Sequence, residues 1–415
     1  MSNFKFKTGK IITSLSLFSI YLIPWVGLID FFMSIGILPG MANRSRSFHP
    51  FPQIVIIREI IIILLLLLLI KNIFFNAGKM QRPLFYSVFL LTPLLLYSTS
   101  FPAFLSGIRQ IIYFAYVPVG FFIYIYAIRT NINIDMRICR SLKIVLVIEC
   151  ILALIQTKFM PAAEGLSHFG SRAIGSFNSP NTLGVFGATV LLILILLSEK
   201  RALHWIYYVC AILTVMASGT RGAFVLLSCT LMLALLKKIR SGVQKGLIAF
   251  VAAGILLFLI INVNAIANKP SAVKKIWGDV CIDNIIQYIG SVDSAKLLTG
   301  YGWGVMTSWF LALGGDRTII HGIGLDSFYA AILAQIGLIG LITFMIYLFW
   351  LFFHAGKEGI LLFLVFCLIG LQINVLEYYP MNLLLFLTLG IFIGKRELEL
   401  YQKTGNFPTM PDNFS

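Results

Sequence analysis

The chain has 415 residues, of which 59% are hydrophobic and 12% are charged, and its formal net charge is +16. Ordinary soluble domains carry about 25% charged residues, so this composition, with a mean hydropathy of +0.94, excludes a typical soluble enzyme. The apolar residues come in blocks of about 20, the length that spans the hydrocarbon as an α-helix. The block EIIIILLLLLLI at 59–70 excludes the alternating pattern of a membrane β-barrel in that segment. We therefore predict an all-α polytopic membrane protein.

Reading the apolar blocks in chain order predicts about 12 transmembrane helices. The N-terminal MSNFKFKTGK and the run after it resemble a signal sequence, but no small-residue cleavage site precedes Pro24, so we expect an uncleaved first helix. Residues 1–402 are expected to form one integral membrane domain, followed by a polar, disordered cytoplasmic tail at 403–415. The predicted spans are about 11–32, 54–73, 84–99, 106–128, 143–161, 182–198, 202–217, 221–237, 245–263, 325–353, 359–376 and 381–394.

The basic residues orient these spans. Most of the 32 lysines and arginines fall on one side when the N-terminus is placed in the cytoplasm, which predicts that both termini are cytoplasmic. One loop of about 60 residues, 264–324, then lies on the outer side, and a loop of this length in a compact chain is usually functional. The positive charge favours anionic lipid as a neighbour, and no basic groove with stacking aromatic residues suggests nucleic acid.

The cysteines and histidines do not predict a metal site or a disulfide framework. The six cysteines show no CxxC spacing, and no histidine-rich segment accompanies them. We therefore expect neither a metal nor another cofactor.

Arginines at the outer membrane edge are the first candidates for chemistry. In SGTRGA, the small and hydroxyl residues before a predicted helix suit its N-terminus, where unpaired N–H groups and the planar guanidinium favour phosphate or diphosphate. In GSRAIGSFNSPNTLG, glycine, asparagine and proline predict a turn that holds an arginine over the next helix start. A third arginine, in SGIRQ, is explained equally well as an anchor whose side chain snorkels to the interface. These arginines are Arg221, Arg172 and, in SGIRQ, Arg109.

A second candidate cluster closes the long loop, in HGIGLDSFYAAILAQIGLIG at 321–340. His321 has a side chain suited to removing a proton from a hydroxyl group, and Asp326 would do the same if burial raised its pKa. The simpler alternative makes His321 a polar loop residue and lets Asp326 or Ser327 cap the next helix, with Tyr329 on its first turn. Spacing alone favours this simpler alternative.

Three acidic residues lie within or near the predicted spans. Glu59 and Glu377 are close to an interface, whereas Glu149 is deeper and would pair with a neighbouring helix. Each is a candidate for lining a proton path, which keeps a transporter open as an alternative.

The order of these motifs resembles the O-antigen polymerase and O-antigen ligase superfamily of bacterial membrane glycosyltransferases. The matching pieces cover roughly 170–345: R-x-x-G-x-F-x-x-P-N from Arg172, SGTRGA around Arg221, LLTGYGWG at 297–304, D-S-F-Y from Asp326, and GLIGL at 337–341. Members of the family are similar in having about twelve helices and a large late periplasmic loop. They act on sugars linked to undecaprenyl diphosphate, without nucleotide sugars and, in the best-understood members, without metal.

The resemblance implies an inner-membrane polysaccharide polymerase with its active site on the periplasmic side. Arg172 and Arg221 would hold the diphosphate, with Arg109 assisting, and His321 or Asp326 would be the general base. Ligases carry a His-Asn pair where this chain has Leu325 and Asp326, which favours the polymerase branch. Aromatic contacts to sugar faces are expected from Tyr301, Trp303 and Tyr329.

The expected partners are oligosaccharides on undecaprenyl diphosphate, the lipid bilayer and a chain-length regulator. The alternatives are an O-antigen ligase that transfers glycan to the lipid A core, and a transporter of lipid-linked oligosaccharides. A transporter predicts paired broken helices in two related halves, and glycine and proline in this chain cluster at helix ends instead.

Overall fold

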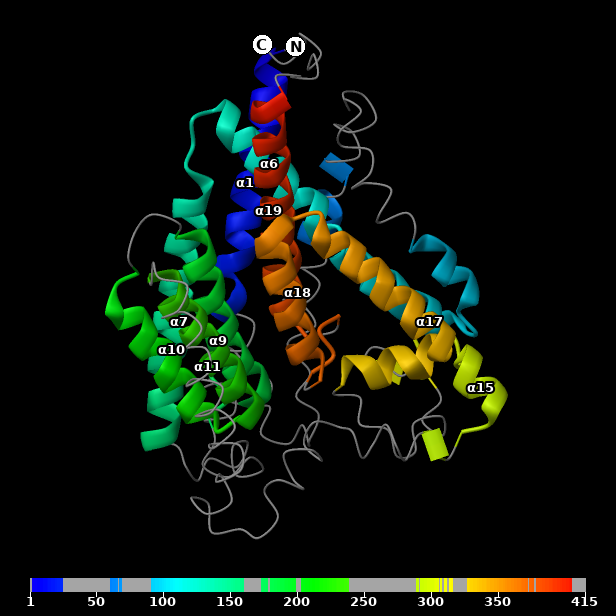
Figure 1. Ribbon diagram of the computed structural model, residues 1–415. Coiled ribbons are helices and arrows are strands. Elements are labelled where there is room, and N and C mark those ends of the chain that lie inside the picture. The colour runs from blue at the N-terminus through cyan, green and yellow to red at the C-terminus, as the bar shows by residue number, and fades with distance from the viewer. Residues whose placement is uncertain are drawn as a thin grey trace, which may run out of the picture.

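The structure of the chain is a computed structural model, and its helices account for most of the residues that it describes (Figure 1). No strand occurs among these residues, which confirms the all-α prediction for this part of the chain. The described residues are 2–24, 60–65, 67–68, 91–159, 173–177, 180–198, 203–238, 289–290, 292–305, 307, 310–311, 313–315, 327–371, 373–376 and 378–404.

The helices keep the labels of Figure 1 throughout. In chain order they are α1 (Ser2–Tyr21), the 3-10 helix η1 (Thr92–Tyr97), α5 (Phe101–Tyr113), α6 (Tyr116–Arg129), α7 (Ile134–Phe159), α9 (Pro180–Leu197), α10 (Trp205–Ser218), α11 (Arg221–Lys238), α15 (Ser294–Thr299), α17 (Phe328–Phe353), α18 (Gly356–Gly370) and α19 (Met381–Thr404).

Most predicted spans coincide with helices, but their ends differ. The predicted span 143–161 corresponds to α7, which begins nine residues earlier, at Ile134, and α19 continues ten residues past its predicted end to Thr404. Hydropathy marks only the apolar part of a helix, and both extensions carry charged residues that are equally able to be helical outside the hydrocarbon. Residues 403–404 of the expected tail belong to α19. The predicted span 245–263 lies outside the described residues.

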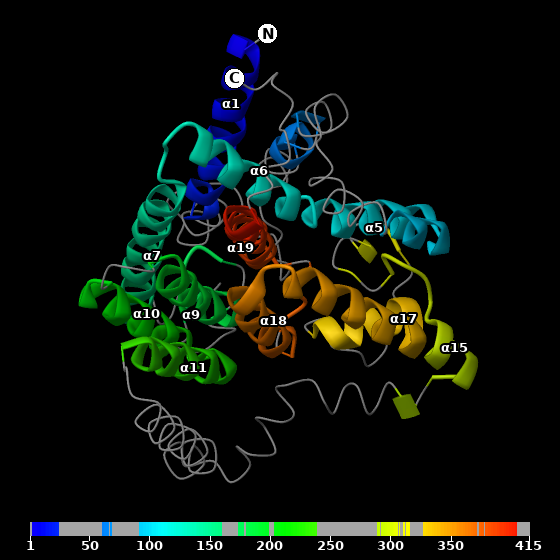
Figure 2. The same cartoon turned by 45° about the horizontal axis from the view of Figure 1, so that its top comes forward.

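The helices form two groups joined through α18 and α19. One group consists of α7, α9, α10 and α11, and the other of α17 with α15; α18 lies between them in both Figure 1 and Figure 2. Among the described helices, α6 and α19 share the most extensive contact, where Gly120 faces the main chain at Leu387 and Gly390 faces the main chain at Val117. Small residues at such a crossing let two helices pack backbone to backbone, as membrane helices commonly do.

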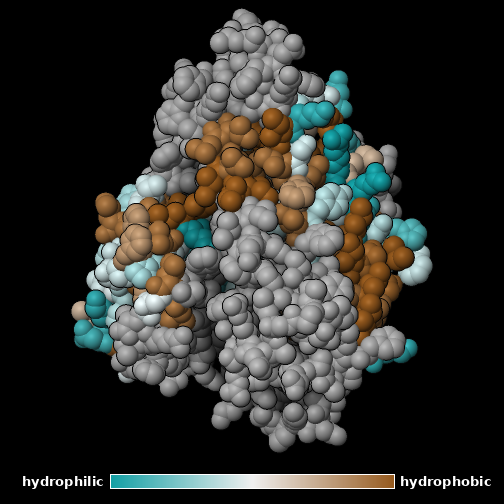
Figure 3. All heavy atoms as spheres, turned by 180° about the vertical axis from the view of Figure 1, so that it is seen from behind, coloured by the Kyte–Doolittle hydropathy of each residue, from teal (hydrophilic) through white to brown (hydrophobic). Residues whose placement is uncertain are grey.

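Among the residues that the structure describes, two segments are long and apolar enough to cross a membrane: Phe101–Ile128, which comprises α5 and nearly all of α6, and Phe328–Phe353, which is α17. The apolar face of α17 is open to the surroundings, and Figure 3 shows broad apolar areas on the surface seen from behind. Burying this stripe in lipid rather than water removes the cost of exposing it. Its members recur at helical spacing and are 48–64% exposed: Ile339, Ile342, Ile346, Phe349 and Phe353.

The first turn of α1 and the last turn of α19 lie at the same end of the molecule (Figure 1). The start of α7 is fixed to this end, because the ammonium of Lys395 on α19 lies 2.8 Å from the carboxylate of Asp135. The 26 residues of α7 extend toward the opposite end over about 39 Å at the rise of an α-helix. That length exceeds the thickness of the hydrocarbon core, about 30 Å.

Candidate functional site

The arginine-bearing turn predicted before α9 is held by two buried side chains of α7. Gln156 accepts hydrogen bonds from the main-chain N–H groups of Ile174 (3.0 Å) and Gly175 (2.7 Å), and its amide nitrogen donates to the Gly175 carbonyl oxygen (2.7 Å). Glu149 accepts from the N–H of Ser176 at 2.9 Å and from the Ser176 hydroxyl. Residues 173–177, which form this turn, are buried throughout.

The turn itself needs glycine at 175. Gly175 has φ of +61°, in the left-handed region that residues with a Cβ rarely adopt. A Cβ there would also lie 2.6 Å from Glu149 Oε2 and 2.7 Å from Leu183 Cδ1. The prediction of a tight turn at this glycine is therefore confirmed. Gly170 and Asn178 lie outside the described residues.

Main-chain and side-chain hydrogen bonds join this segment to the second arginine motif. The N–H of Ala173 donates to the carbonyl oxygen of Ala217, the residue before SGTRGA, at 2.9 Å. The Thr220 hydroxyl lies 3.4 Å from the Asn181 amide oxygen and donates to it. The structure thus brings together two sequence motifs that are some forty residues apart.

Close packing between the helices that follow these motifs reinforces the junction. A Cβ on Gly184 of α9 would lie 2.8 Å from Ala223 Cβ and 3.0 Å from Thr220 Cβ. The second turn of α9 and the start of α11 therefore meet with no room for a side chain between them. We call this contact the α9–α11 junction.

The helix start predicted in SGTRGA is confirmed, because α11 begins at Arg221. The Ser218 hydroxyl accepts from the Thr220 N–H at 3.2 Å and donates to the Val215 carbonyl oxygen at 2.7 Å, which orders the turn between α10 and α11. The first N–H groups of an α-helix have no partner within the helix, and its N-terminus carries partial positive charge. An 18-residue helix that starts with arginine is therefore suited to an anion at this end. The side chain of Arg221, and Arg172 altogether, lie outside the described residues.

The long loop contributes a second ordered segment, residues 299–304 (TGYGWG), which we call the strap. Its main chain binds α17 near a break in that helix: the N–H of Tyr301 donates to Ala334 (2.8 Å) and that of Gly302 donates to Gln335 (2.9 Å). The Gly304 N–H donates to the Gln335 side-chain oxygen at 3.1 Å. The break is at Gly337, whose φ of +68° interrupts the helix.

The strap also binds the chain around the start of α5. The Ser98 hydroxyl donates to the Trp303 carbonyl oxygen at 3.0 Å, and the Tyr97 hydroxyl donates to Thr299 at 2.6 Å. The indole N–H of Trp303 donates to the Gly107 carbonyl oxygen at 3.2 Å. The strap therefore connects α5 to the first half of α17.

The aromatic residues predicted to contact sugar lie in different surroundings. Trp303 is fully buried and its ring packs against Phe344, so in this structure the indole offers no face to a sugar, and we assign it to packing. Tyr301 is partly exposed, with the Lys296 ammonium 5.5 Å from its ring centre. Tyr329 lies on the first turn of α17 as predicted, and its hydroxyl donates to the Cys367 carbonyl oxygen at 3.1 Å.

Of the residues predicted to cap α17, only Ser327 is described, and it does not cap the helix with its side chain. Its hydroxyl instead donates to the Gly370 carbonyl oxygen at the end of α18, at 3.3 Å. His321 and Asp326, the two candidate bases, lie outside the described residues.

Arg109 lies on α5, in the part of the molecule that holds the strap. Its guanidinium is 5.6 Å from the ring centre of Tyr113, one turn further along the helix. In Figures 1 and 2, α5 lies on the other side of α18 and α19 from α9, α10 and α11. The structure thus joins the segments that carry Arg172 and Arg221, whereas Arg109 belongs to a different group of helices.

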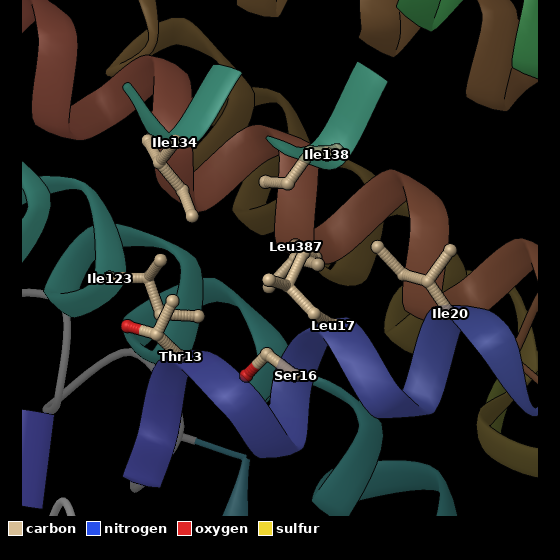
Figure 4. A pocket seen from close by; sticks show the side chains of 8 residues that line it. All are labelled: Thr13, Ser16, Leu17, Ile20, Ile123, Ile134, Ile138 and Leu387. Atoms are coloured by element: carbon tan, nitrogen blue, oxygen red, sulfur yellow. The ribbon is translucent and has the colours of Figure 1, made fainter. Parts of the chain in front are cut away.

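A crevice at the junction of α1, α6, α7 and α19 does not suit an anionic substrate (Figure 4). None of the side chains that line it is charged. They are Thr13, Ser16, Leu17, Ile20, Ile123, Ile134, Ile138 and Leu387.

Sequence reasoning missed Gln156 and assigned Glu149 only to an unspecified partner. The signal was present, because the two lie seven residues apart in an otherwise apolar stretch and so share one face of α7. What the sequence does not indicate is that their partners are main-chain groups 18 to 27 residues further along the chain.

Comparison of the chain with models of protein families and with curated proteins finds no match.

Proposed function

We propose that the chain is a polysaccharide polymerase of the bacterial inner membrane, in the O-antigen polymerase branch of the superfamily that its motifs resemble. It would cross the membrane with about twelve helices, keep both termini in the cytoplasm and act on the periplasmic side. Its donor is a growing glycan on undecaprenyl diphosphate, and its acceptor is a lipid-linked repeat unit. Lateral entry between helices suits both substrates, since each has a lipid anchor.

The observation that carries the proposal is the hydrogen bond from Ala173 to Ala217 (2.9 Å). It joins the residue after Arg172 to the last turn of α10, four residues before Arg221, so the two motif segments share one location. Paired guanidinium groups at a helix start suit a diphosphate, because each binds two phosphate oxygens and the helix adds free N–H donors.

In the proposed reaction, the bond between C1 of the donor's reducing-end sugar and the diphosphate oxygen breaks. A bond forms between that carbon and a hydroxyl oxygen at the non-reducing end of the acceptor. The hydroxyl proton goes to His321 or Asp326, and undecaprenyl diphosphate leaves. Arg172 and Arg221 stabilise the leaving group as its negative charge develops. Holding both substrates at once replaces a collision by positioning.

Transfer to a second lipid-linked repeat distinguishes this function from the ligase alternative. The test uses a strain in which the gene for this chain is deleted and restored as variants, with the surface glycan resolved on a gel. Loss of a polymerase leaves a single repeat on the lipid A core, whereas loss of a ligase leaves none. We expect single repeats from Arg172→Ala and Arg221→Ala at normal protein levels. Normal ladders from both variants would remove the diphosphate site.

Glu149 bears on the transporter alternative. A residue in a proton path needs access to water or to another titratable group, but Glu149 is fully buried and both carboxylate oxygens accept hydrogen bonds from Ser176. This arrangement favours a structural acceptor over a proton carrier.

A further inference from the structure

We propose that Glu149 and Gln156 are positioning residues for diphosphate binding: they fix the conformation of Ile174–Ser176, the part of the turn that follows Arg172 in the sequence. This inference rests on the proposed function and names two residues that the motifs do not contain. Neither side chain touches the substrate, because both are buried behind the turn.

The hydrogen bonds satisfy the main chain of the turn almost completely. The N–H groups of Ile174, Gly175 and Ser176 donate to these two side chains, and the Gly175 carbonyl oxygen accepts from one of them. Buried main-chain polar groups are stable only where they are paired, and residues 173–177 are buried throughout. Two side chains of one rigid helix supply these partners, so the turn takes its position from α7.

The cost of burying these side chains indicates that the arrangement is specific. A carboxylate or an amide without hydrogen bonds is expensive in an apolar interior. Here each side chain is paired with the turn, so the turn and α7 stabilise each other only when they are correctly aligned. Glu149 and Gln156 are two helical turns apart, and this spacing sets the line along which Ile174–Ser176 lies.

Fixing the turn matters for catalysis because donors are most effective when they are already in place as charge develops. Arg172 is separated from Ile174 by one residue, and Ala173 between them is bound to Ala217. Releasing the turn from α7 would free the main chain that directly follows Arg172. A misplacement of about 1 Å at a reacting centre costs on the order of 100-fold in rate.

The test uses the full chain, purified in detergent, with undecaprenyl diphosphate as the probe and undecaprenol, which lacks phosphate, as the matched ligand. The variants are Glu149→Leu and Gln156→Leu, which keep similar size but remove the hydrogen bonds. The conservative variant is Glu149→Gln, which keeps a carbonyl acceptor for the Ser176 N–H without charge. The matched control is Gln110→Met on α5, a buried glutamine whose amide has no hydrogen-bond partner among the described residues.

Two measurements are made on each variant. Amide hydrogen exchange of peptides that cover 173–177 reports whether the turn is still bound to α7. Native mass spectrometry titrations report the affinities for undecaprenyl diphosphate and for undecaprenol. A general loss of folding would weaken both ligands alike, whereas loss of positioning weakens only the one with phosphates.

We expect both leucine variants to exchange faster at 173–177 and to bind undecaprenyl diphosphate roughly tenfold or more weakly, since a displaced guanidinium loses its paired contacts. Their affinity for undecaprenol should stay as in the wild type. Glu149→Gln should bind undecaprenyl diphosphate within about threefold of the wild type, because its acceptor remains. Gln110→Met should match the wild type in every measurement.

Three results would overturn the inference. Leucine variants that bind undecaprenyl diphosphate normally, while Arg221→Ala does not, would exclude positioning and leave the proposed function standing. If Glu149→Gln loses affinity for undecaprenyl diphosphate as much as Glu149→Leu does, the negative charge of Glu149, and not its hydrogen bonds to the turn, is responsible. Normal binding by both Arg172→Ala and Arg221→Ala would remove the proposed site itself, and the inference with it.

If the leucine variants do not purify, Ser176→Ala carries the test. It removes only the hydroxyl that donates to Glu149 and leaves the Ser176 N–H bond in place. We expect a smaller loss of the same kind, with faster exchange at 173–177 and weaker binding of undecaprenyl diphosphate alone. Unchanged exchange and unchanged affinity would contradict the inference.

Discussion

The indole N–H of Trp303, in the strap, donates a hydrogen bond to the carbonyl oxygen of Gly107 on α5, 3.2 Å away and 196 residues earlier in the chain. The absence of a side chain at Gly107 makes this contact feasible, because a Cβ there would lie 2.9 Å from the indole nitrogen and closer still to the neighbouring ring carbon. A fully buried tryptophan thus fixes the long loop to α5.

Gly107→Ala should therefore destabilise the protein. The added methyl group has to displace the indole ring, and overpacking of this kind costs about 1–3 kcal/mol. We expect a lower apparent melting temperature in detergent. Gly290→Ala is the control, because a Cβ at Gly290 meets no atom within 4 Å. Equal melting temperatures for the two variants would show that Trp303 is not held against Gly107.

Gly337→Ala should release the strap from α17. Gly337 has φ of +68°, and a Cβ there would lie 2.5 Å from the main-chain nitrogen of Thr299, so the substitution both strains the backbone and pushes the strap away. We expect faster trypsin cleavage after Lys296, three residues before the strap. The control is Ile346→Ala, at an exposed position on the same helix, and trypsin should cleave this variant at the wild-type rate. Wild-type cleavage of the glycine variant would mean that the helix break does not hold the strap.

Gly184→Ala should impair chain extension by widening the α9–α11 junction. The new Cβ would lie 2.8 Å from that of Ala223, and the helix starts that follow the two arginine motifs would separate. We expect shorter ladders from the restored strain at normal protein levels. Gly187→Ala, one turn further along α9, is the comparison: its Cβ would press on the Thr214 side chain of α10 at 3.1 Å, outside the α9–α11 junction, so we expect longer ladders than from Gly184→Ala. If both variants give full ladders, the closeness of the junction is irrelevant to activity.

The orientation of the chain is open to a direct test with reporters. Fluorescent protein joined after Thr404, at the end of α19, should fluoresce, because it folds in the cytoplasm. Alkaline phosphatase joined after Gly219, between α10 and α11, should be active, because it requires the periplasm. The reverse pair of results would contradict the proposed topology and place the arginine motifs in the cytoplasm.

The local features of the site could be predicted from the sequence because they depend on neighbouring residues. Glycine at 175 predicted a tight turn, and the small and hydroxyl residues of SGTRGA predicted the start of α11. The extension of α7 back to Ile134 was missed, because hydropathy locates the lipid boundary and not the end of the helix.

The tertiary contacts could not be predicted in this way. Nothing near Trp303 in the sequence indicates that its ring is covered by α5, so an aromatic residue in an outer loop suggested a sugar contact. Similarly, the partner of Glu149 is Ser176, on a turn whose approach to α7 depends on the packing of α7 against α9 and α10. A hydrophobic pattern identifies helices but does not show which faces meet.

In the proposed reaction, Arg172 and Arg221 hold the diphosphate of a lipid-linked glycan while the chain is extended. The most direct measurement reconstitutes the purified protein in liposomes with undecaprenyl-diphosphate-linked repeat units and follows glycan length together with released undecaprenyl diphosphate. The proposed reaction predicts longer glycans from the wild type, with one undecaprenyl diphosphate released for each bond formed, and neither product from Arg172→Ala or Arg221→Ala. Repeat units that cross the bilayer without growing, or arginine variants that extend glycan at the wild-type rate, would contradict it.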